Sequence, residues 1–387
     1  MLNRIIFFII IVLCSNTSFS QEPVVIGQKK VIHSNILKED RTYQIYLPKS
    51  YGWALDRYYP VLYVLDGESN FIHTTATVDF LSSASEIPEL IIVAITSTIR
   101  IRDFTQTDWS SHWIGGGGAN NFKSFLSKEL IPEIEKDFRI NKFRILSGHS
   151  AGGQFVLYTL SSEPALFNAY FSISPSLDWD DNLPQRSLEE SFEHTDSLKA
   201  FLYFAWSDDL GQALANDQKL LETLKTKSPK KFRWIGKGYP EETHSSISLP
   251  AQIDALRQLY AGYRLHNDLL VNGFNFAEKH FKEVSNKVGY TIPVPEDVIN
   301  NFGYEALNNG NIKEAMDFFK HNIDQNPNSA NAFDSMADAY EEAGMWDEAL
   351  KSSERAVELA NKYGDPGLSN FIKHTNRIKE KYKPIEK

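Results

Sequence analysis

Apolar runs and helical periodicity alternate along the first part of the chain. Residues 41–48 alternate apolar and polar side chains and end at a proline, which predicts a half-buried strand. Residues 59–67 and 89–97 are continuous apolar runs, as in strands that are buried on both faces. Residues 121–138 carry apolar side chains at helical spacing. The alternation continues to about residue 263 and predicts an α/β fold, a mostly parallel central sheet flanked by helices.

From there to the end the chain shows no strand pattern and repeats itself. Pairs of similar residues recur 34 positions apart: Gly310 and Gly344, Ala315 and Ala349, Phe302 and Met336, and Ile323 and Val357. This period resembles the tetratricopeptide repeat, in which small residues lie where two helices cross. We expect an all-helical region over residues 264–387, with repeats at about 299–365. Such arrays present surfaces that bind a protein partner or a second copy of the chain.

The amino terminus has the pattern of a targeting signal. Arg4 precedes an apolar run at residues 5–14, and small residues follow before Gln21. The pattern predicts a signal peptide of residues 1–20, a first folded domain over residues 21–263, and a secreted or periplasmic mature chain. An uncleaved membrane anchor is the alternative, but the run is short for a span, so we expect no stable span in the mature chain.

The composition excludes several classes of function. The formal net charge is −10, which argues against a nucleic-acid surface because such surfaces need clustered Lys and Arg. The only cysteine, Cys14, lies inside the expected signal, so the mature chain has no disulfide, cysteine nucleophile or thiolate metal site. No His, Asp and Glu group has metal-ligand spacing and no cofactor motif occurs, so we expect neither metal nor cofactor.

A glycine-flanked serine is the main candidate for chemistry. Residues 148–152 read GHSAG and fit the pattern G-x-S-x-G. An apolar run at 143–146 leads into it, and a helix start rich in small residues follows at Ala151. This strand–turn–helix setting is typical of a nucleophile elbow, whose strained turn projects the hydroxyl from the carboxyl end of the sheet. We interpret Ser150 as a nucleophile; an ordinary serine in a tight turn is the alternative.

A serine nucleophile needs a base, and an acid that orients the base. Asp208 and Asp209 directly follow the strand-like run at residues 199–207 and are both candidate acids. His244 lies in a loop after the next strand-like run, at 232–235. This position suits the base when the chain order is serine, acid, histidine.

Other residues are expected to surround the reacting ester. Acyl transfer forms an oxyanion that must meet N–H donors already in place. We expect the backbone N–H groups of Ala151, directly after the nucleophile, and of Glu68, after the third strand. His149 and Trp179 are expected to contact the substrate, His149 by shaping the pocket and Trp179 as a wall of it.

Residues 31–263 resemble the esterase family of α/β-hydrolases that includes esterase D, feruloyl esterases and enterochelin esterases. The matching segments, in family order, include RTYQIYLPKSY, YPVLYVLDGESNF, GHSAGG, FSISPSLDW and ETHSSI. The resemblance implies a serine esterase that forms an acyl-enzyme from a small-molecule ester, with Ser150 as nucleophile, His244 as base and Asp209 as acid. The family's usual glycine three residues before the acid is Trp206 here, so the neighbouring aspartate stays an alternative.

Two further functions fit parts of the sequence. One is a noncatalytic module whose repeats recruit a partner, although the nucleophile, acid and base in order argue against it. The other is a serine peptidase on the same fold, which cleavage of amides would identify. Acylated sugars, feruloyl esters and siderophore lactones are all candidate substrates.

Overall fold

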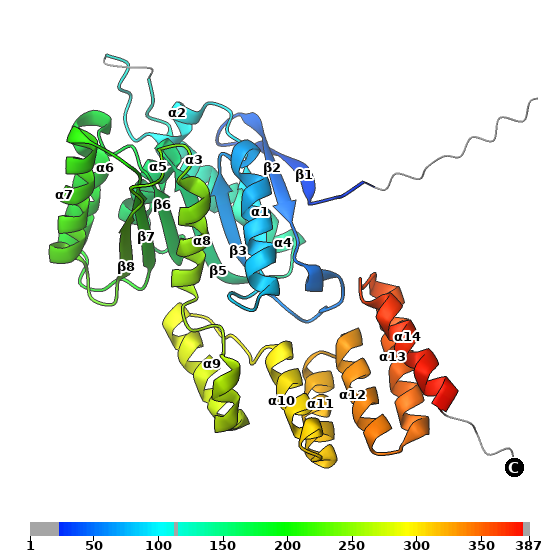
Figure 1. Ribbon diagram of the computed structural model, residues 1–387. Coiled ribbons are helices and arrows are strands. Elements are labelled where there is room, and N and C mark those ends of the chain that lie inside the picture. Colours follow the sequence, from blue (N-terminus) through cyan, green and yellow to red (C-terminus); the bar gives the residue numbers. More distant parts are fainter. Residues whose placement is uncertain (1–22, 112–114, 382–387) are drawn as a thin grey trace, which may run out of the picture.

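An eight-stranded sheet forms the centre of the computed structural model, which describes residues 23–111 and 115–381 (Figure 1). The strand order is β1-β2-β4-β3-β5-β6-β7-β8; β1 and β2 run antiparallel to their neighbours and all other pairs are parallel. The strands are β1 (Gln28–Ser34), β2 (Glu39–Tyr46), β3 (Tyr59–Leu65), β4 (Ile91–Ile95), β5 (Ile140–His149), β6 (Ala169–Ile173), β7 (Phe201–Trp206) and β8 (Arg233–Gly238). The predicted mostly parallel sheet is confirmed.

Burial explains which strands the sequence pattern predicted. Every residue of β3 and β4 is buried, as their continuous apolar runs indicate. Side chains of β2 alternate between buried and partly exposed, and Arg41, Tyr43 and Ile45 point into the core. The pattern did not predict β1, because only Ile32 and Ser34 of this edge strand are buried.

Helices cover both faces of the sheet (Figure 1). The apolar side chains of α1 and α8 join one buried cluster, and those of the remaining helices of this region join a second cluster across the sheet. The predicted helix at 121–138 consists of α3 and α4 joined by a π-helical turn (Leu126–Leu130). The helices are α1 (Gly67–Ser83), α2 (Arg100–Phe104), α3 (Ala119–Phe125), α4 (Ile131–Asp137), α5 (Ala151–Ser162), α6 (Trp179–Glu193), α7 (Gly211–Lys227) and α8 (Ser248–Leu259).

The rest of the described chain is helical, as the sequence predicts. A 3₁₀ turn (Asn267–Asn272) precedes α9 (Phe274–Val288), α10 (Glu296–Asn308), α11 (Ile312–Gln325), α12 (Ala330–Glu342), α13 (Trp346–Tyr363) and α14 (Leu368–Lys381). Helices α12 and α13 begin 34 residues after α10 and α11. Gly310 and Gly344, at the same place in the two hairpins, have positive φ angles of 77° and 70°. The likeness of the two helical hairpins to tetratricopeptide repeats stays a prediction.

The helical region shares a core with the sheet region. Ala277 and Phe281 of α9 belong to the same buried cluster as residues of the sheet, and the rings of Phe143 in β5 and Tyr290 lie 4.8 Å apart. Farther along, the guanidinium of Arg57 donates a 3.0 Å hydrogen bond to the side chain of Asn326. Helix α9 is therefore held against the sheet, at the edge opposite the carboxyl ends of the parallel strands (Figure 1).

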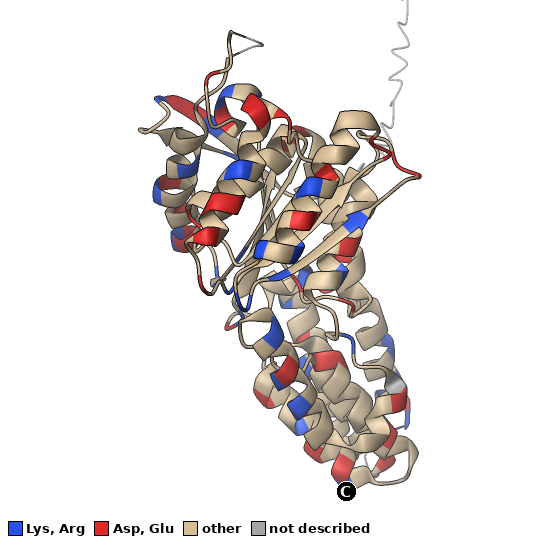
Figure 2. Ribbon diagram, turned by 90° about the vertical axis from the view of Figure 1, so that its left-hand side faces the viewer, with Lys and Arg blue, Asp and Glu red and all other residues tan. Residues whose placement is uncertain are grey.

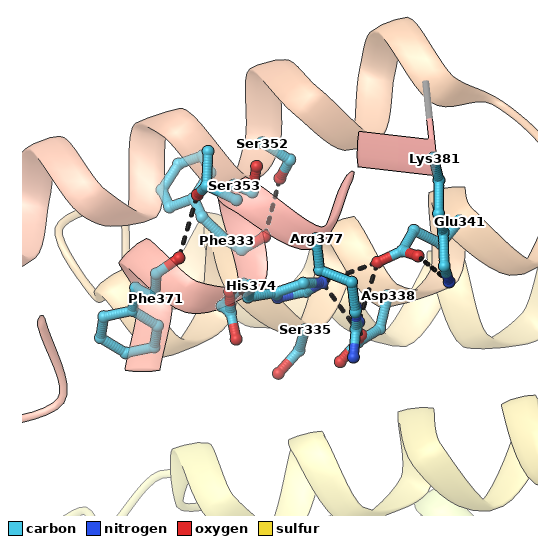
Figure 3. A network of polar contacts seen from close by, with 12 residues as sticks. Phe333, Ser335, Asp338, Glu341, Ser352, Ser353, Phe371, His374, Arg377 and Lys381 are labelled. Carbon is cyan, nitrogen blue, oxygen red and sulfur yellow. Dashed lines mark hydrogen bonds and ion pairs between the residues drawn. The ribbon is translucent and has the colours of Figure 1, made fainter. Parts of the chain in front are cut away.

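Ion pairs connect α14 to α12. His374 contacts Asp334 through Nδ1 (2.7 Å) and Glu341 through Nε2 (2.8 Å), and Arg377 pairs with Glu341 at 2.9 Å and with Asp338 at 3.3 Å (Figure 3). The side chains of His374 and Glu341 are largely buried between the two helices. Elsewhere, acidic and basic residues are interspersed along the helices (Figure 2).

The predicted signal, residues 1–20, lies outside the described residues. Among the residues that the structure does describe, no helix has the length and apolar character needed to cross a bilayer.

Candidate active site

Ser150 lies on a sharp turn between a strand and a helix. Strand β5 ends at His149 and α5 begins at Ala151, and Ser150 between them has φ 59° and ψ −121°. A positive φ is uncommon outside glycine and marks a strained position. The backbone N–H of Ser150 donates to the carbonyl of Ile173 at 3.0 Å, which fixes the turn. The strained turn that the sequence predicts is confirmed, while the nucleophilic role of Ser150 stays a prediction.

Glycines make this turn possible. A Cβ atom added at Gly148 would lie 2.4 Å from the carbonyl oxygen of Gly152, closer than real Cβ atoms approach. Strand and helix therefore cross at a distance that only glycine permits at this position.

Two helices begin beside Ser150. Strands β3 and β5 are parallel neighbours, so α1, which follows β3, and α5, which follows β5, both start at this edge of the sheet. Their first turns hold Glu68 and Ala151, and the N-terminal ends of helices favour negative charge. The carboxylate of Glu68 accepts a hydrogen bond from the N–H of Ser97 at 3.0 Å. The two backbone N–H groups stay predicted oxyanion donors.

His244 lies in the loop after β8 at the same edge. Its Nδ1 atom is 2.9 Å from the hydroxyl of Ser174, and its carbonyl oxygen lies 2.6 Å from Nε2 of His149. The two imidazole rings are 4.7 Å apart. Because His149 directly precedes Ser150, its contact with His244 places the histidine and the serine at the same edge of the sheet, although they are far apart in sequence.

His149 holds the histidine loop in place. A carbonyl oxygen only accepts, so Nε2 of His149 carries the hydrogen in this contact. Burial, followed by the proximity of His244, lowers the pKa of His149 to about 4, so the ring is neutral at pH 7. Its contact is with the backbone of His244, and its predicted part in substrate binding remains untested.

Ser174 is a site residue that the sequence did not predict. It follows β6, has a positive φ of 40°, and donates its N–H to the carbonyl of Ala205 at 2.7 Å. Its hydroxyl lies 3.4 Å from that of Ser207 in addition to its contact with His244. The feature of the sequence that could have identified Ser174 as a site residue is its position, a polar residue directly after a buried strand.

Asp209 approaches the histidine only through these serines. Its Oδ2 accepts hydrogen bonds from the hydroxyl of Ser207 at 3.0 Å and from the N–H of Ser207 at 3.2 Å. Asp208 is exposed and donates its own N–H to the carbonyl of Glu242. In the described part of the chain, no hydrogen bond joins either aspartate to His244, so the choice of acid stays a prediction.

Trp179 is buried near the site. It begins α6, is 2% exposed, and its indole N–H donates to the hydroxyl of Thr107 at 3.2 Å. Its ring packs against that of Trp109, with centroids 5.2 Å apart. Its role as a wall of the substrate pocket stays a prediction.

Two cavities bear on function. One of about 200 Å³ adjoins His244 and Ser174. A larger one, of about 650 Å³, lies between the sheet region and the helical region, at the start of β3. No histidine is among the described residues that line the larger cavity, so it offers no serine–histidine pair.

A single group of described side chains has the geometry to hold a metal ion. Atoms of Asp334, Asp338 and His374 lie within 4.8 Å of one another. His374 already pairs with Asp334 and Glu341, and Asp338 pairs with Arg377. All three side chains lie in α12 and α14, far along the chain from Ser150. We therefore read this group as an ion-pair network.

The family model described as "Putative esterase" matches residues 34–250, more than half of the chain. The chain belongs to this esterase family. This membership confirms the family resemblance of the sequence over its α/β region.

Individual relatives agree with this family. The "Ferri-bacillibactin esterase BesA" of Bacillus subtilis (strain 168) is 36% identical over 161 residues, 36% of this chain and 56% of that protein. The chain thus spans about half the length of the curated relatives it matches. An "IroE-like serine hydrolase" from Shewanella oneidensis is 28% identical with a TM-score of 0.66, over 75% of this chain and 96% of that one.

One solved structure also matches most of the helical region. An uncharacterised protein from Capnocytophaga ochracea DSM 7271 has a TM-score of 0.60 over 92% of this chain and 99% of that one. At 16% identity, this likeness shows a shared fold.

Proposed function

We propose that this protein hydrolyses carboxylic esters through an acyl-enzyme formed on Ser150. The observation that carries the proposal is the strained position of Ser150 at the end of β5, with His244 held at the same edge of the sheet. In this scheme His244 takes the proton of the Ser150 hydroxyl as it attacks the ester carbonyl, and gives it to the leaving alcohol. Water then releases the acid by the same steps.

The oxyanion would be stabilised by backbone N–H groups. Those of Ala151 and Glu68 lie in the first turns of α5 and α1, where the helix ends add to the field that favours negative charge. Neither donor depends on its side chain.

Orientation of the histidine would come from a hydroxyl relay, by which we mean Ser174, Ser207 and Asp209. The contacts of 2.9, 3.4 and 3.0 Å run from His244 Nδ1 to Ser174, from Ser174 to Ser207 and from Ser207 to the carboxylate. If His244 carries its resting proton on Nδ1, it donates to the hydroxyl of Ser174. That hydroxyl then donates to Ser207, and Ser207 donates to Asp209. The negative carboxylate would thereby favour the imidazolium that forms during reaction, acting through the hydroxyl groups of Ser174 and Ser207.

The substrate proposed is a small-molecule ester. A similar protein of Emericella nidulans is named "Siderophore enterobactin esterase", so siderophore lactones join acylated sugars and feruloyl esters in the first panel to test. Amide cleavage, as by a peptidase, is the second candidate because the same constellation performs both reactions.

The helical region is proposed to be an accessory domain. The helices of its second hairpin begin 34 residues after those of the first, and the turn glycines recur at the same spacing. Gly303 lets Phe319 pack closely against α10. These features support a tetratricopeptide-like unit for a protein partner or for self-association. Export through a signal at residues 1–20 is likewise proposed.

Replacement of the nucleophile tests the mechanism. Ser150→Ala should lower kcat for an aryl ester by several orders of magnitude, since members of such a site act as a unit. A matched control is Ser161→Ala, at the far end of α5, whose hydroxyl bonds only to the carbonyl of Tyr158 at 3.0 Å. A folded Ser150→Ala protein with the turnover of the Ser161→Ala control would refute the proposal.

A further inference from the structure

The cavity beside His244 is lined by carboxylates. It holds about 200 Å³, and its described lining includes no lysine or arginine. It adjoins the reacting groups, because Ser176 in its wall donates its N–H to the carbonyl of Ser150 at 3.2 Å. The acidic and histidine side chains of the lining are Asp178, Asp209, Asp217 and His244.

Asp217 has the most unusual position of these groups. It lies on α7, its residue is 4% exposed, and Oδ2 has no hydrogen-bond partner. The side-chain amide of Gln212, which also lines the cavity, donates to the side chain of Asn216 at 2.9 Å. A buried carboxylate without a partner is costly and rare in proteins, and it calls for an explanation.

The electrostatics of the cavity point in the same direction. Burial, followed by the charge of Asp209, raises the pKa of Asp217 to about 7. A cation placed between the two carboxylates would relieve their repulsion and bring an opposite charge beside Asp217. An anion there would meet like charges.

We propose that this cavity, lined by Asp178, Asp209 and Asp217, is a subsite for a cationic group of the ester substrate. We call it the acidic subsite. The inference rests on the proposed esterase function and names a substrate class for it, esters that carry an ammonium group a few bonds from the scissile carbonyl. Asp217 would then be a specificity determinant, while the bond-breaking step is unchanged.

Matched chromogenic esters test the subsite. The cationic probe is p-nitrophenyl 4-(trimethylammonio)butanoate, its neutral isostere is p-nitrophenyl 5,5-dimethylhexanoate, and p-nitrophenyl hemiglutarate supplies an anion. Butyrylcholine and 3,3-dimethylbutyl butyrate place the same pair on the alcohol side. We expect kcat/KM to favour the cation at least tenfold over its isostere in one of the two pairs, and to be lowest for the anion.

Substitutions test whether Asp217 causes the preference for cationic esters. Asp217→Asn should lower the ratio of cationic to neutral kcat/KM about tenfold, and the exposed Asp178→Asn should lower it less. Glu222→Gln is the control, because it removes the same charge from an exposed position on the same helix. Should Asp217→Asn fail to fold, Asp178→Asn and the loss of preference at high salt carry the test.

The outcomes separate the two proposals. Turnover of neutral esters with no preference for the cation in either pair would overturn the acidic subsite and leave the esterase intact. If no ester of any charge is hydrolysed, the esterase proposal fails. Binding of 4-(trimethylammonio)butanoate to Ser150→Ala, measured by calorimetry, then decides for or against the subsite alone, with Ser150→Ala carrying Asp217→Asn as its control.

Discussion

The hydroxyl of Ser174 lies 2.9 Å from Nδ1 of His244, at the place where the acid of a triad contacts its histidine. Ser174 holds this place with a strained backbone, and Ser207 connects it to the carboxylate of Asp209. A neutral hydroxyl orients an imidazole but stabilises its positive charge far less than a carboxylate does. In the proposed mechanism, orientation and charge stabilisation would therefore be divided between Ser174 and Asp209.

Removal of the Ser174 hydroxyl should therefore disturb the histidine directly. We expect Ser174→Ala to lower kcat about 10 to 100-fold on a neutral aryl ester, because Nδ1 loses its partner and the ring its preferred orientation. The pH dependence of kcat/KM should also shift, a change that a purely structural defect would not produce. Ser174→Asn keeps a hydrogen-bonding side chain, tolerates the positive φ of this position and should restore part of the activity. Equal losses in both variants would contradict the positioning role.

The two aspartates make a second comparison. Asp209→Asn should lower kcat/KM more than Asp208→Asn, because Asp209 is bonded to the relay through Ser207 while Asp208 is exposed. We expect a loss of about 10 to 1,000-fold for Asp209→Asn, less than removal of a directly bonded acid costs. The reverse ranking would assign the acid to Asp208. Small and equal losses would show that the serine–histidine pair works without a carboxylate.

The ion pairs of His374 predict a pH dependence of stability. Burial lowers the pKa of His374, but its hydrogen bond to Asp334 and the carboxylates of Glu341 and Asp338 outweigh burial, so the pKa is raised. The protonated form thus favours folding: the stabilisation is complete below pH 6.5 and is lost as the pH rises through the folded-state pKa.

His374→Gln gives the measurement. The free energy of unfolding of the variant should be lower than that of the unmodified chain by about 2 kcal/mol at pH 6, and lower by a smaller amount at pH 9. Thermal or denaturant unfolding at the two pH values would show this. Lys379→Gln, exposed on the same helix, is the control. A difference that does not change with pH would contradict a charged His374.

Shortened chains test the division of labour between the regions. A chain that ends at Pro293 retains α9, whose Ala277 and Phe281 are buried against the sheet region, and Tyr290, whose ring contacts Phe143. It should hydrolyse small aryl esters at a rate within about threefold of the full chain. A chain that ends at Arg264 exposes this apolar surface and should aggregate or unfold more readily. An inactive but folded chain ending at Pro293 would show that α10 to α14 contribute to the site.

The sequence by itself determined the local features of this protein. The order of apolar runs and helical segments predicted the parallel sheet, since burial on both faces leaves a continuous apolar pattern. The glycines around Ser150 predicted its strained turn, because that geometry excludes larger side chains within a few residues of it. Esterase family membership rests on segments of the same kind, each short and local, that fall in a fixed order.

Only the tertiary structure decided which distant groups touch. Ser174 follows β6, whereas Ser207 and Asp209 follow β7. The contact between the two serines depends on the register of β6 and β7 and on loop geometry that no periodicity encodes. The unpartnered carboxylate of Asp217 was equally hidden, since on the sequence it is one acid among many along a helix. Its meaning comes from burial, and burial is set by how α7 packs against the end of the sheet, a property of the whole fold.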